Sequence, residues 1–463
     1  MARIDIKSNG GATLSDGVLQ IENGVALDGT LRNVADQNNT TSPLLLSTTS
    51  VTALGGNEVA SNTAFGTGAL TANTVGTDST AFGMSALGSS STGSSNTAIG
   101  HEALLTNVSG NNNTAIGKHA LRFNSTGGGN TATGTQAMRL NSTGTGNSAY
   151  GYLALENNTN SNNTALGYRS LRANTSGSLN VAVGVDALLS ATTGTSNVAV
   201  GYQALNTNTT GINNTALGTQ SLFTNDTGSR NVAVGRQTMY FNTTGERNTA
   251  VGIAALSSNT TGSYHTAVGE FALFSNTTGN NNTAIGREAL KQNVIGSNNV
   301  ALGFSALLLN TADNNTAVGY EAGYSNTSGT GITTIGYQAL KSNTTGAQNT
   351  AIGDNALFDL TTGVLNVGIG YNSNVWSSNA VASTCIGGDT KGSTNSTCIG
   401  YLAQDSNGSS VCLGRQAQST ASNQFVVGSA GTNAGSVTIA PAVQSAYWTI
   451  KINGTDYKVL LAV

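Results

Sequence analysis

The sequence predicts an all-β chain, a repetitive parallel β-solenoid of about 23 rungs, and three observations carry this prediction. Twenty-three glycines from Gly66 to Gly428 end a phrase that reads Asn-Thr-Ala-Ile-Gly in its purest form. Seventeen of their 22 intervals show the same 17-residue spacing, two show a 16-residue spacing, and the last three are shorter still. Both prolines, Pro43 and Pro441, lie outside this array, as expected if its residues donate N–H groups to a continuous ladder. Such a period indicates one unit stacked on itself.

Three segments are predicted in order along the chain. Residues 1–50 form an N-terminal attachment or capping segment, residues 51–430 the repeat shaft, and residues 431–463 a C-terminal cap or tip. An imperfect first rung is expected at Val51–Gly55. An Asn-Gly pair between apolar runs is typical of a tight hairpin. Hairpins are therefore predicted over Val18–Leu27 and Trp448–Val459, and they would cover the open edges of the array.

Each 17-residue rung is expected to hold two short strands and two turns, as in Asn282–Asn298. Gly, Thr and Asn fill the unit without a 3.6-residue apolar stripe, which excludes a helix. In the Thr-Ala-Ile strand, the alanine faces opposite to its two neighbours. Both faces of the strand hold a restricted set of residue types, but a narrow roll buries only one of these faces. The other face is expected to pack against another copy of the same chain.

Columns of identical residues should form where rungs stack. The asparagine before the strand (Asn96, Asn113, Asn282) is expected to exchange amide hydrogen bonds with its neighbours, and the glycine after the strand (Gly100, Gly117, Gly201, Gly286) to end it. Three cysteines, Cys385, Cys398 and Cys412, replace the alanine in consecutive short rungs. They are interpreted as a buried apolar column, since an odd count argues against a disulfide framework.

Composition excludes several classes of function. A net charge of −3 with 18 Lys and Arg leaves no basic patch for nucleic acid. No stretch suits membrane insertion, and the start of the chain lacks the apolar segment of a signal peptide. No motif for catalysis appears, so neither an enzyme nor a cofactor or metal is expected. His101 and His119, in adjacent rungs, are interpreted as surface residues rather than ligands.

The phrases Asn-Thr-Ala-Ile-Gly-x-x-Ala-Leu and Asn-Val-Ala-Val-Gly-x-x-Ala-Leu resemble the head repeats of trimeric autotransporter adhesins of the YadA type. The resemblance covers about 375 of the 463 residues and implies a left-handed parallel β-roll in an intertwined homotrimer. Those heads favour shorter rungs, like the last three here, so the 17-residue rungs carry a longer second turn. The main architectural rival, a left-handed β-helix, is built of whole hexapeptides. The 17-residue rungs do not divide into hexapeptides, and the short rungs fit worse.

These repeats, flanked by a short polar N-terminus and by the C-terminal phrase from Tyr447 to Lys458, also look like tail-fibre or related virion proteins of bacteriophages, cyanophages included. This second resemblance implies a virion fibre that leaves the cell by lysis and needs no signal peptide. Its expected partners are two further copies of itself, a tail or baseplate component at the N-terminus, and a glycan or protein of the host surface. A bacterial surface adhesin is the alternative. An ice-binding solenoid is the third hypothesis, and valines interrupt its threonine column.

The position after the ladder glycine is predicted to face outward, and its aromatic residues are the candidate receptor or glycan contacts, because sugars stack on aromatic rings. The alternative is a purely structural role, in which these rings pack over neighbouring turns or across the interface between chains of a trimer. Trp448 is a further candidate contact in the C-terminal segment. The candidates of the column are Tyr152, Tyr168, Tyr202, Phe304, Tyr320, Tyr337, Tyr371 and Tyr401.

Overall fold

The computed structural model describes residues 61–429 without a break. Outside this range it describes only the backbone of the strands at residues 12–15, 18–21, 32–35, 41–46, 432–438, 446–452 and 455–461. The chain divides into two compact units, Met1–Asn213 and Asn214–Val463. Each unit contains a parallel β-solenoid, which confirms the predicted fold class.

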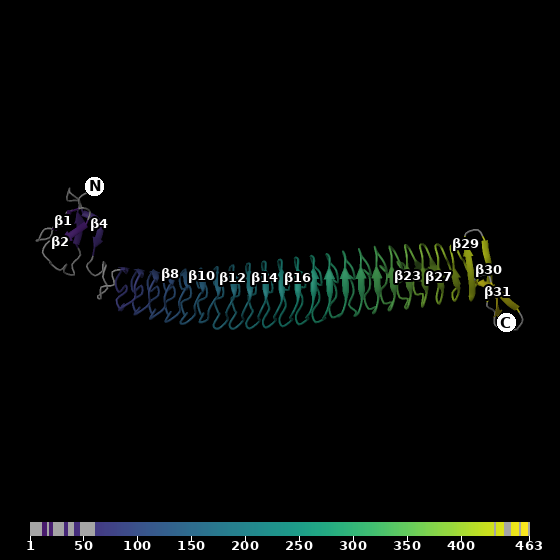
Figure 1. Ribbon diagram of the computed structural model, residues 1–463, viewed down its shortest axis with the longest axis horizontal. Coiled ribbons are helices and arrows are strands. Elements are labelled where there is room, and N and C mark those ends of the chain that lie inside the picture. The colour runs from purple at the N-terminus through teal and green to yellow at the C-terminus, as the bar shows by residue number, and fades with distance from the viewer. Residues whose placement is uncertain are drawn as a thin grey trace. The chain divides into compact units, whose positions relative to one another are not determined.

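In the first unit, residues 61–213 form nine three-residue strands that pair in parallel, each with the next along the chain (Figure 1). The register joins equivalent repeat positions, such as Ala98 with Ala115. The strands are β5 (Thr63–Phe65), β6 (Thr80–Phe82), β7 (Thr97–Ile99), β8 (Thr114–Ile116), β9 (Thr131–Thr133), β10 (Ser148–Tyr150), β11 (Thr164–Leu166), β12 (Val181–Val183) and β13 (Val198–Val200).

The second unit repeats this arrangement over residues 214–429. Its parallel ladder runs through β14 (Thr215–Leu217), β15 (Val232–Val234), β16 (Thr249–Val251), β17 (Thr266–Val268), β18 (Thr283–Ile285), β19 (Val300–Leu302), β20 (Thr316–Val318), β21 (Thr333–Ile335), β22 (Thr350–Ile352), β23 (Val367–Ile369), β25 (Thr384–Ile386), β27 (Thr397–Ile399), β28 (Val411–Leu413) and β29 (Gln424–Ser429). The ladder ends where β30 (Thr432–Thr438) pairs antiparallel with β29.

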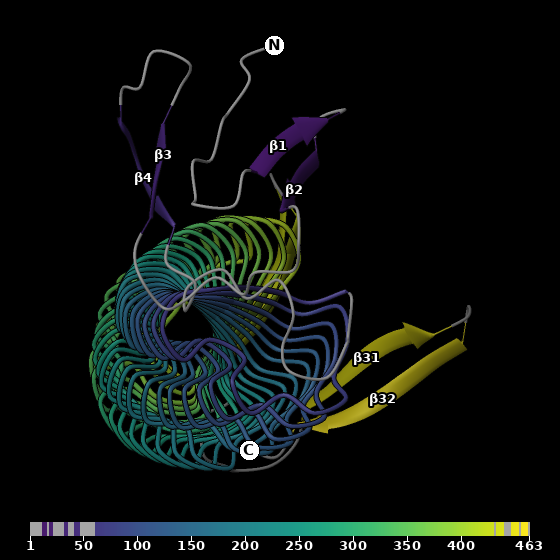
Figure 2. The same cartoon turned by 90° about the vertical axis from the view of Figure 1, so that its left-hand side faces the viewer.

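Three antiparallel pairs stand apart from the ladders in the hydrogen-bond pattern (Figure 2). The strands β31 (Ala446–Ile452) and β32 (Thr455–Leu461) pair antiparallel, with Ile452 opposite Thr455, which agrees with the predicted C-terminal hairpin. Near the N-terminus, β1 (Ala12–Ser15) pairs with β2 (Val18–Ile21), and β3 (Arg32–Ala35) pairs with β4 (Thr41–Leu46). The expected Asn23-Gly24 turn and the first rung at residues 51–55 lie outside the described residues.

The prediction of two strands in each 17-residue coil is wrong. Within a coil such as Asn282–Asn298, the one strand is β18, and the chain then turns at Leu290, where φ is 52°. Leu290 N–H still donates to Ala306 O of the next coil at 3.0 Å, so the ladder continues through a turn. A second strand forms only near the shorter coils, as β24 (Asn374–Val375) paired with β26 (Lys391–Gly392).

Small apolar side chains fill the inside of each coil. Ala284 of the strand and Ala289 and Leu290 of the turn are fully buried, as are their equivalents in most coils. On the strand, Thr283 is half-buried and Ile285 is exposed, as the alternation predicts. The core is therefore narrow, and an alanine at each strand centre sets its thickness.

Two buried asparagine columns connect successive coils. In the predicted column, Asn130 N–H donates to Asn113 Oδ1 at 3.0 Å, and Asn113 Nδ2 donates to Gly127 O at 2.9 Å. In a second column, Asn124 Nδ2 donates to Asn107 Oδ1 at 2.7 Å and also to Gly127 O. The sequence analysis did not predict this second column. Across the described residues, no helix is long and apolar enough to cross a bilayer.

Candidate functional site

The outer face of each ladder carries a column of exposed apolar side chains. They occupy the strand position before the ladder glycine, and the register places each beside its equivalent, as Val268 beside Ile285 and Ile285 beside Leu302. Ile285 is 37% exposed. We call these residues the apolar strip: Phe65, Phe82, Ile99, Ile116, Tyr150, Leu166 and Val200 in the first unit, and Leu217, Val251, Ile285, Leu302, Ile335, Ile399 and Val427 in the second.

The aromatic residues after the ladder glycine form a second exposed column, as predicted. All eight candidates in this column are exposed, except Phe304, which is half-exposed. Tyr152 stacks on Tyr168 with ring centroids 5.5 Å apart, Phe304 on Tyr320 at 5.2 Å, and Tyr320 on Tyr337 at 5.3 Å. The side chain of Trp448 lies outside the described residues.

Stacking limits what these rings can bind. Tyr320 has a ring on each side, Phe304 on one face and Tyr337 on the other, with interplanar angles of 11° and 12°. The guanidinium of Arg287 lies 5.7 Å from the Phe304 ring centroid. A sugar that stacks on an aromatic ring needs a free face, so this part of the column offers ring edges and hydroxyls. Tyr371, 60% exposed, has no ring stacked on it among the described side chains.

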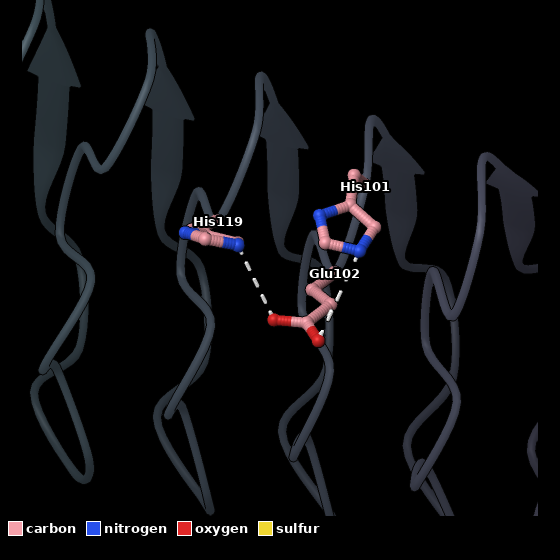
Figure 3. A group of neighbouring side chains, drawn as sticks. All are labelled: His101, Glu102 and His119. Atoms are coloured by element: carbon pink, nitrogen blue, oxygen red, sulfur yellow. Dashed lines mark ion pairs between the residues drawn. The ribbon is translucent and has the colours of Figure 1, made fainter.

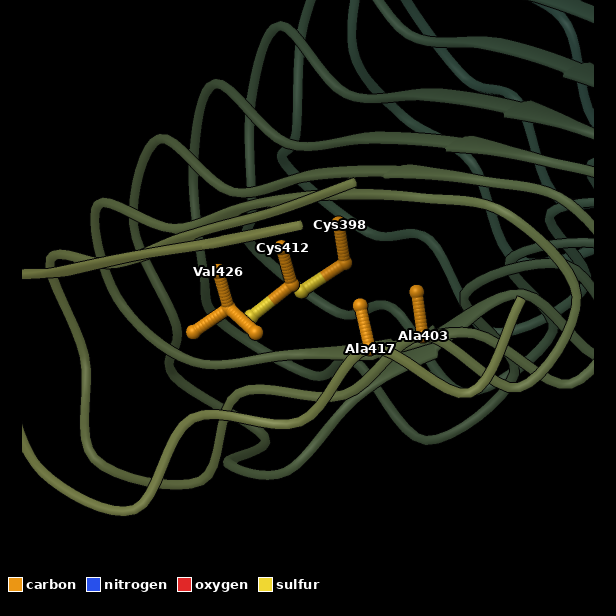
Figure 4. Close-up of a cluster of buried hydrophobic side chains, with 5 residues drawn as sticks. All are labelled: Cys398, Ala403, Cys412, Ala417 and Val426. Carbon is orange, nitrogen blue, oxygen red and sulfur yellow. The ribbon is translucent and has the colours of Figure 1, made fainter. Parts of the chain in front are cut away.

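The three cysteines form one buried column in the second unit. Cys385 pairs in register with Cys398, and Cys398 with Cys412, and all three are free thiols with no exposed surface. Burial raises the pKa of Cys385 to about 12, and a hydrogen bond with Cys412, with burial, raises the pKa of Cys398. Figure 4 shows Cys398 and Cys412 packed beside Val426, Ala403 and Ala417. The thiols therefore act as small core side chains, as the sequence predicts.

One buried histidine, which the sequence analysis did not single out, belongs to the first asparagine column. His265 takes the place of an asparagine, and its Nδ1 accepts the N–H of Asn282 at 3.2 Å. Burial lowers the pKa of His265 to about 4. Its neutral ring thus performs the acceptor role that an amide oxygen has in neighbouring coils. The sequence could have predicted this role, because His265 lies one 17-residue period before Asn282 and so holds the asparagine position of its coil.

Acidification should therefore destabilise the coils around His265. Its folded pKa of about 4 lies below the unfolded value of 6.5, so the unfolded state binds the proton first as the pH falls. Stability is complete above pH 6.5 and is lost between pH 6.5 and 4, by about 3 kcal/mol at most. Hydrogen exchange of the amides near residue 265 at pH 7 and pH 4, corrected for intrinsic rates, measures this loss. His265→Asn, which restores the column, should remove the difference, and an equal loss in that variant would contradict the assignment.

A second group of titratable side chains lies on the surface of the first unit. Glu102 and His119 hold equivalent positions in successive coils, and His101 precedes Glu102 (Figure 3). The His119 Nε2 is 3.3 Å from Glu102 Oε2, and the His101 Nε2 is 3.9 Å from Glu102 Oε1. Burial and the nearby Arg122 guanidinium lower the pKa of His119. The sequence analysis noted both histidines but missed Glu102, which lies one 17-residue period before His119 and could have been found from that spacing.

Comparison with known proteins adds no relationship. No protein-family model matches the chain, and no curated protein matches its sequence. The similarity to YadA-type heads therefore rests on the repeated phrases, and the parallel ladder agrees with it at the level of a β-solenoid.

Proposed function

We propose that this chain is the repetitive shaft of a homotrimeric virion fibre, a phage tail fibre that presents a host-receptor-binding surface. One observation carries the proposal: the apolar strip recurs along both ladders on the face that the coil itself does not cover. A row of exposed apolar residues that recurs over many coils marks an interaction surface. A β-solenoid of this kind is compatible with a structural fibre.

The occupant that fits the apolar strip best is another copy of the same chain. A second copy carries a strip with the same coil spacing, so equivalent rows meet along their whole length. The half-buried threonines beside the strip, such as Thr283 beside Ile285, keep this face free of charge. Three copies arranged around one axis would cover it, as the resemblance to trimeric heads implies.

The assignment to a phage particle is supported by the resemblance of the repeats, together with the C-terminal phrase Tyr447–Lys458, to tail-fibre or related virion proteins. In this proposal, the N-terminal segment binds a tail or baseplate component, and the exposed aromatic column or the C-terminal segment contacts the host. Peptide mass spectrometry of purified phage particles from the source sample tests it: recovery of this chain in bacterial envelope fractions alone would favour the adhesin alternative.

The native mass of the full chain tests the trimer. We expect light scattering to give three times the chain mass of 46.5 kDa. Ile285→Lys/Leu302→Lys places charges in the apolar strip and should shift the mass toward 46.5 kDa at low concentration, because unpaired charges are costly to bury. Ile295→Lys is the matched control, since Ile295 is exposed in the turn of the same coil and lies outside the strip. A well-folded wild-type monomer would overturn the proposal.

A further inference from the structure

We propose that His101, Glu102 and His119 form a zinc-binding site that connects two adjacent coils of the first unit. One ligand atom from each residue lies within 4.8 Å of the other two. A tetrahedral ion with bonds of about 2.0–2.1 Å needs ligand atoms roughly 3.3 Å apart. The rings and the carboxylate therefore need only a small rotation to converge on one ion.

The donor set favours zinc over calcium or magnesium. Two imidazole nitrogens and one carboxylate oxygen are ligands that suit Zn²⁺, whereas Ca²⁺ and Mg²⁺ prefer oxygen alone. The three side chains are half-buried, so an ion can enter from solvent and water can complete its coordination. Each ligand is mounted on the ladder, which fixes the separation of Glu102 and His119 at one coil.

Arg122 occupies a supporting position at this site. Its Nε lies 2.6 Å from Glu102 Oε2, so the guanidinium and the carboxylate form an ion pair. An arginine beside one carboxylate oxygen leaves the other, Oε1, to face the ion, and ligating carboxylates are commonly held by such outer partners. The ion pair with Arg122 thus holds the Glu102 carboxylate in place between the two histidines.

A second cluster of the chain shows the same arrangement without histidine. Glu321 corresponds to Glu102, and Gln338 of the next coil corresponds to His119. Tyr320 holds the position of His101, and Lys341 holds that of Arg122. Gln338 Nε2 donates to Glu321 Oε2 at 2.8 Å, and Lys341 Nζ lies 2.7 Å from the same oxygen. The solenoid therefore tolerates glutamine and tyrosine at these positions.

This correspondence supplies a variant that should fold. His101→Tyr/His119→Gln copies the residues of the second cluster into the first and removes both nitrogen ligands. We expect the untagged, chelator-treated full chain to bind one Zn²⁺ per chain in calorimetry at pH 7. The variant should bind at least about tenfold more weakly, since even outer partners of metal ligands contribute 10–100-fold.

Two further measurements locate the ion. Co²⁺ in place of Zn²⁺ should give visible absorption bands in the wild type that the double variant lacks, and excess Mg²⁺ should not displace it. Zn²⁺ should slow hydrogen exchange around residues 99–122. His265 is no rival ligand, because it is buried and its Nδ1 already accepts a hydrogen bond. Absence of saturable binding, or equal binding by the folded double variant, would overturn the site.

Discussion

Gly286→Ala is expected to unfold the coils around it, at a cost of about 3–5 kcal/mol. At Gly286 φ is 131°, a conformation that L-residues rarely adopt, and an added Cβ would lie 2.4 Å from Gly303 O and 2.6 Å from Gly303 C. The obstructing atoms are backbone atoms of the next coil, which cannot rotate away as a side chain would. Thermal unfolding of the purified protein and hydrogen exchange in residues 266–320 measure the effect.

Gly331→Asn is the matched control for Gly286→Ala. Gly331 also has a positive φ, 66°, but an added Cβ would meet only the Gln348 side chain, at 3.6 Å. Asn281 and Asn298 occupy the corresponding turn position with φ of 57° and 59°. The control should therefore change stability little. Similar losses in both variants would show that glycine flexibility, rather than contact between coils, sets the requirement at Gly286.

Asn113→Ala should destabilise the first unit by about 2–4 kcal/mol, the second large effect. The fully buried Asn113 side chain accepts the backbone N–H of Asn130 at 3.0 Å and donates to Gly127 O at 2.9 Å. Alanine leaves the Asn130 N–H buried without that acceptor, and an unsatisfied buried donor costs more than the hydrogen bond contributes. Denaturant unfolding followed by hydrogen exchange in residues 96–131 checks this value.

Asn113→Ser should recover much of the loss. Ser79 holds the corresponding position two coils earlier, and its Oγ accepts the N–H of Asn96 at 3.2 Å. Serine thus keeps the acceptor for the next coil while it loses the amide donor. If serine and alanine destabilise equally, the hydrogen bond to the next backbone N–H does not carry the stability of the column.

Spacing alone was enough to predict the ladder. Glycines one 17-residue period apart, such as Gly269 and Gly286, fix which residues pair, and alternation in Thr-Ala-Ile fixes which side chain is buried. The prediction of a second strand in each coil was wrong for a local reason. Leucine is common in strands and helices, and nothing in the sequence indicates that Leu290 adopts a φ of 52°. That conformation depends on hydrogen bonds to the next coil, which override the preference of the single residue.

The candidate sites were predictable in part. Outward placement of Tyr320 and Tyr337 follows from their position after the glycine, whereas the stacking that covers the faces of Tyr320 depends on side-chain rotamers. The proximity of Glu102 to His119 follows from the 17-residue period alone, whereas the contact of His101 with Glu102 depends on side-chain rotamers. Aligning the coils on their glycines, before any single residue is weighed, reveals such pairs.

The 16-residue coil from Gly303 to Gly319 shows that the length of this protein is open to change. There Asn310 Nδ2 donates to Ala312 O at 2.8 Å, two residues on, where Asn293 donates to Gly296 O, three residues on, at the same distance. One turn residue is therefore dispensable. When a whole period is removed, the asparagines on either side of the deletion again hold equivalent positions and continue the same column. A ladder shortened or extended by one whole coil would therefore keep its backbone pairing, while side-chain pairs particular to one place, such as Arg169 with Asp186, would be lost if their coil were removed.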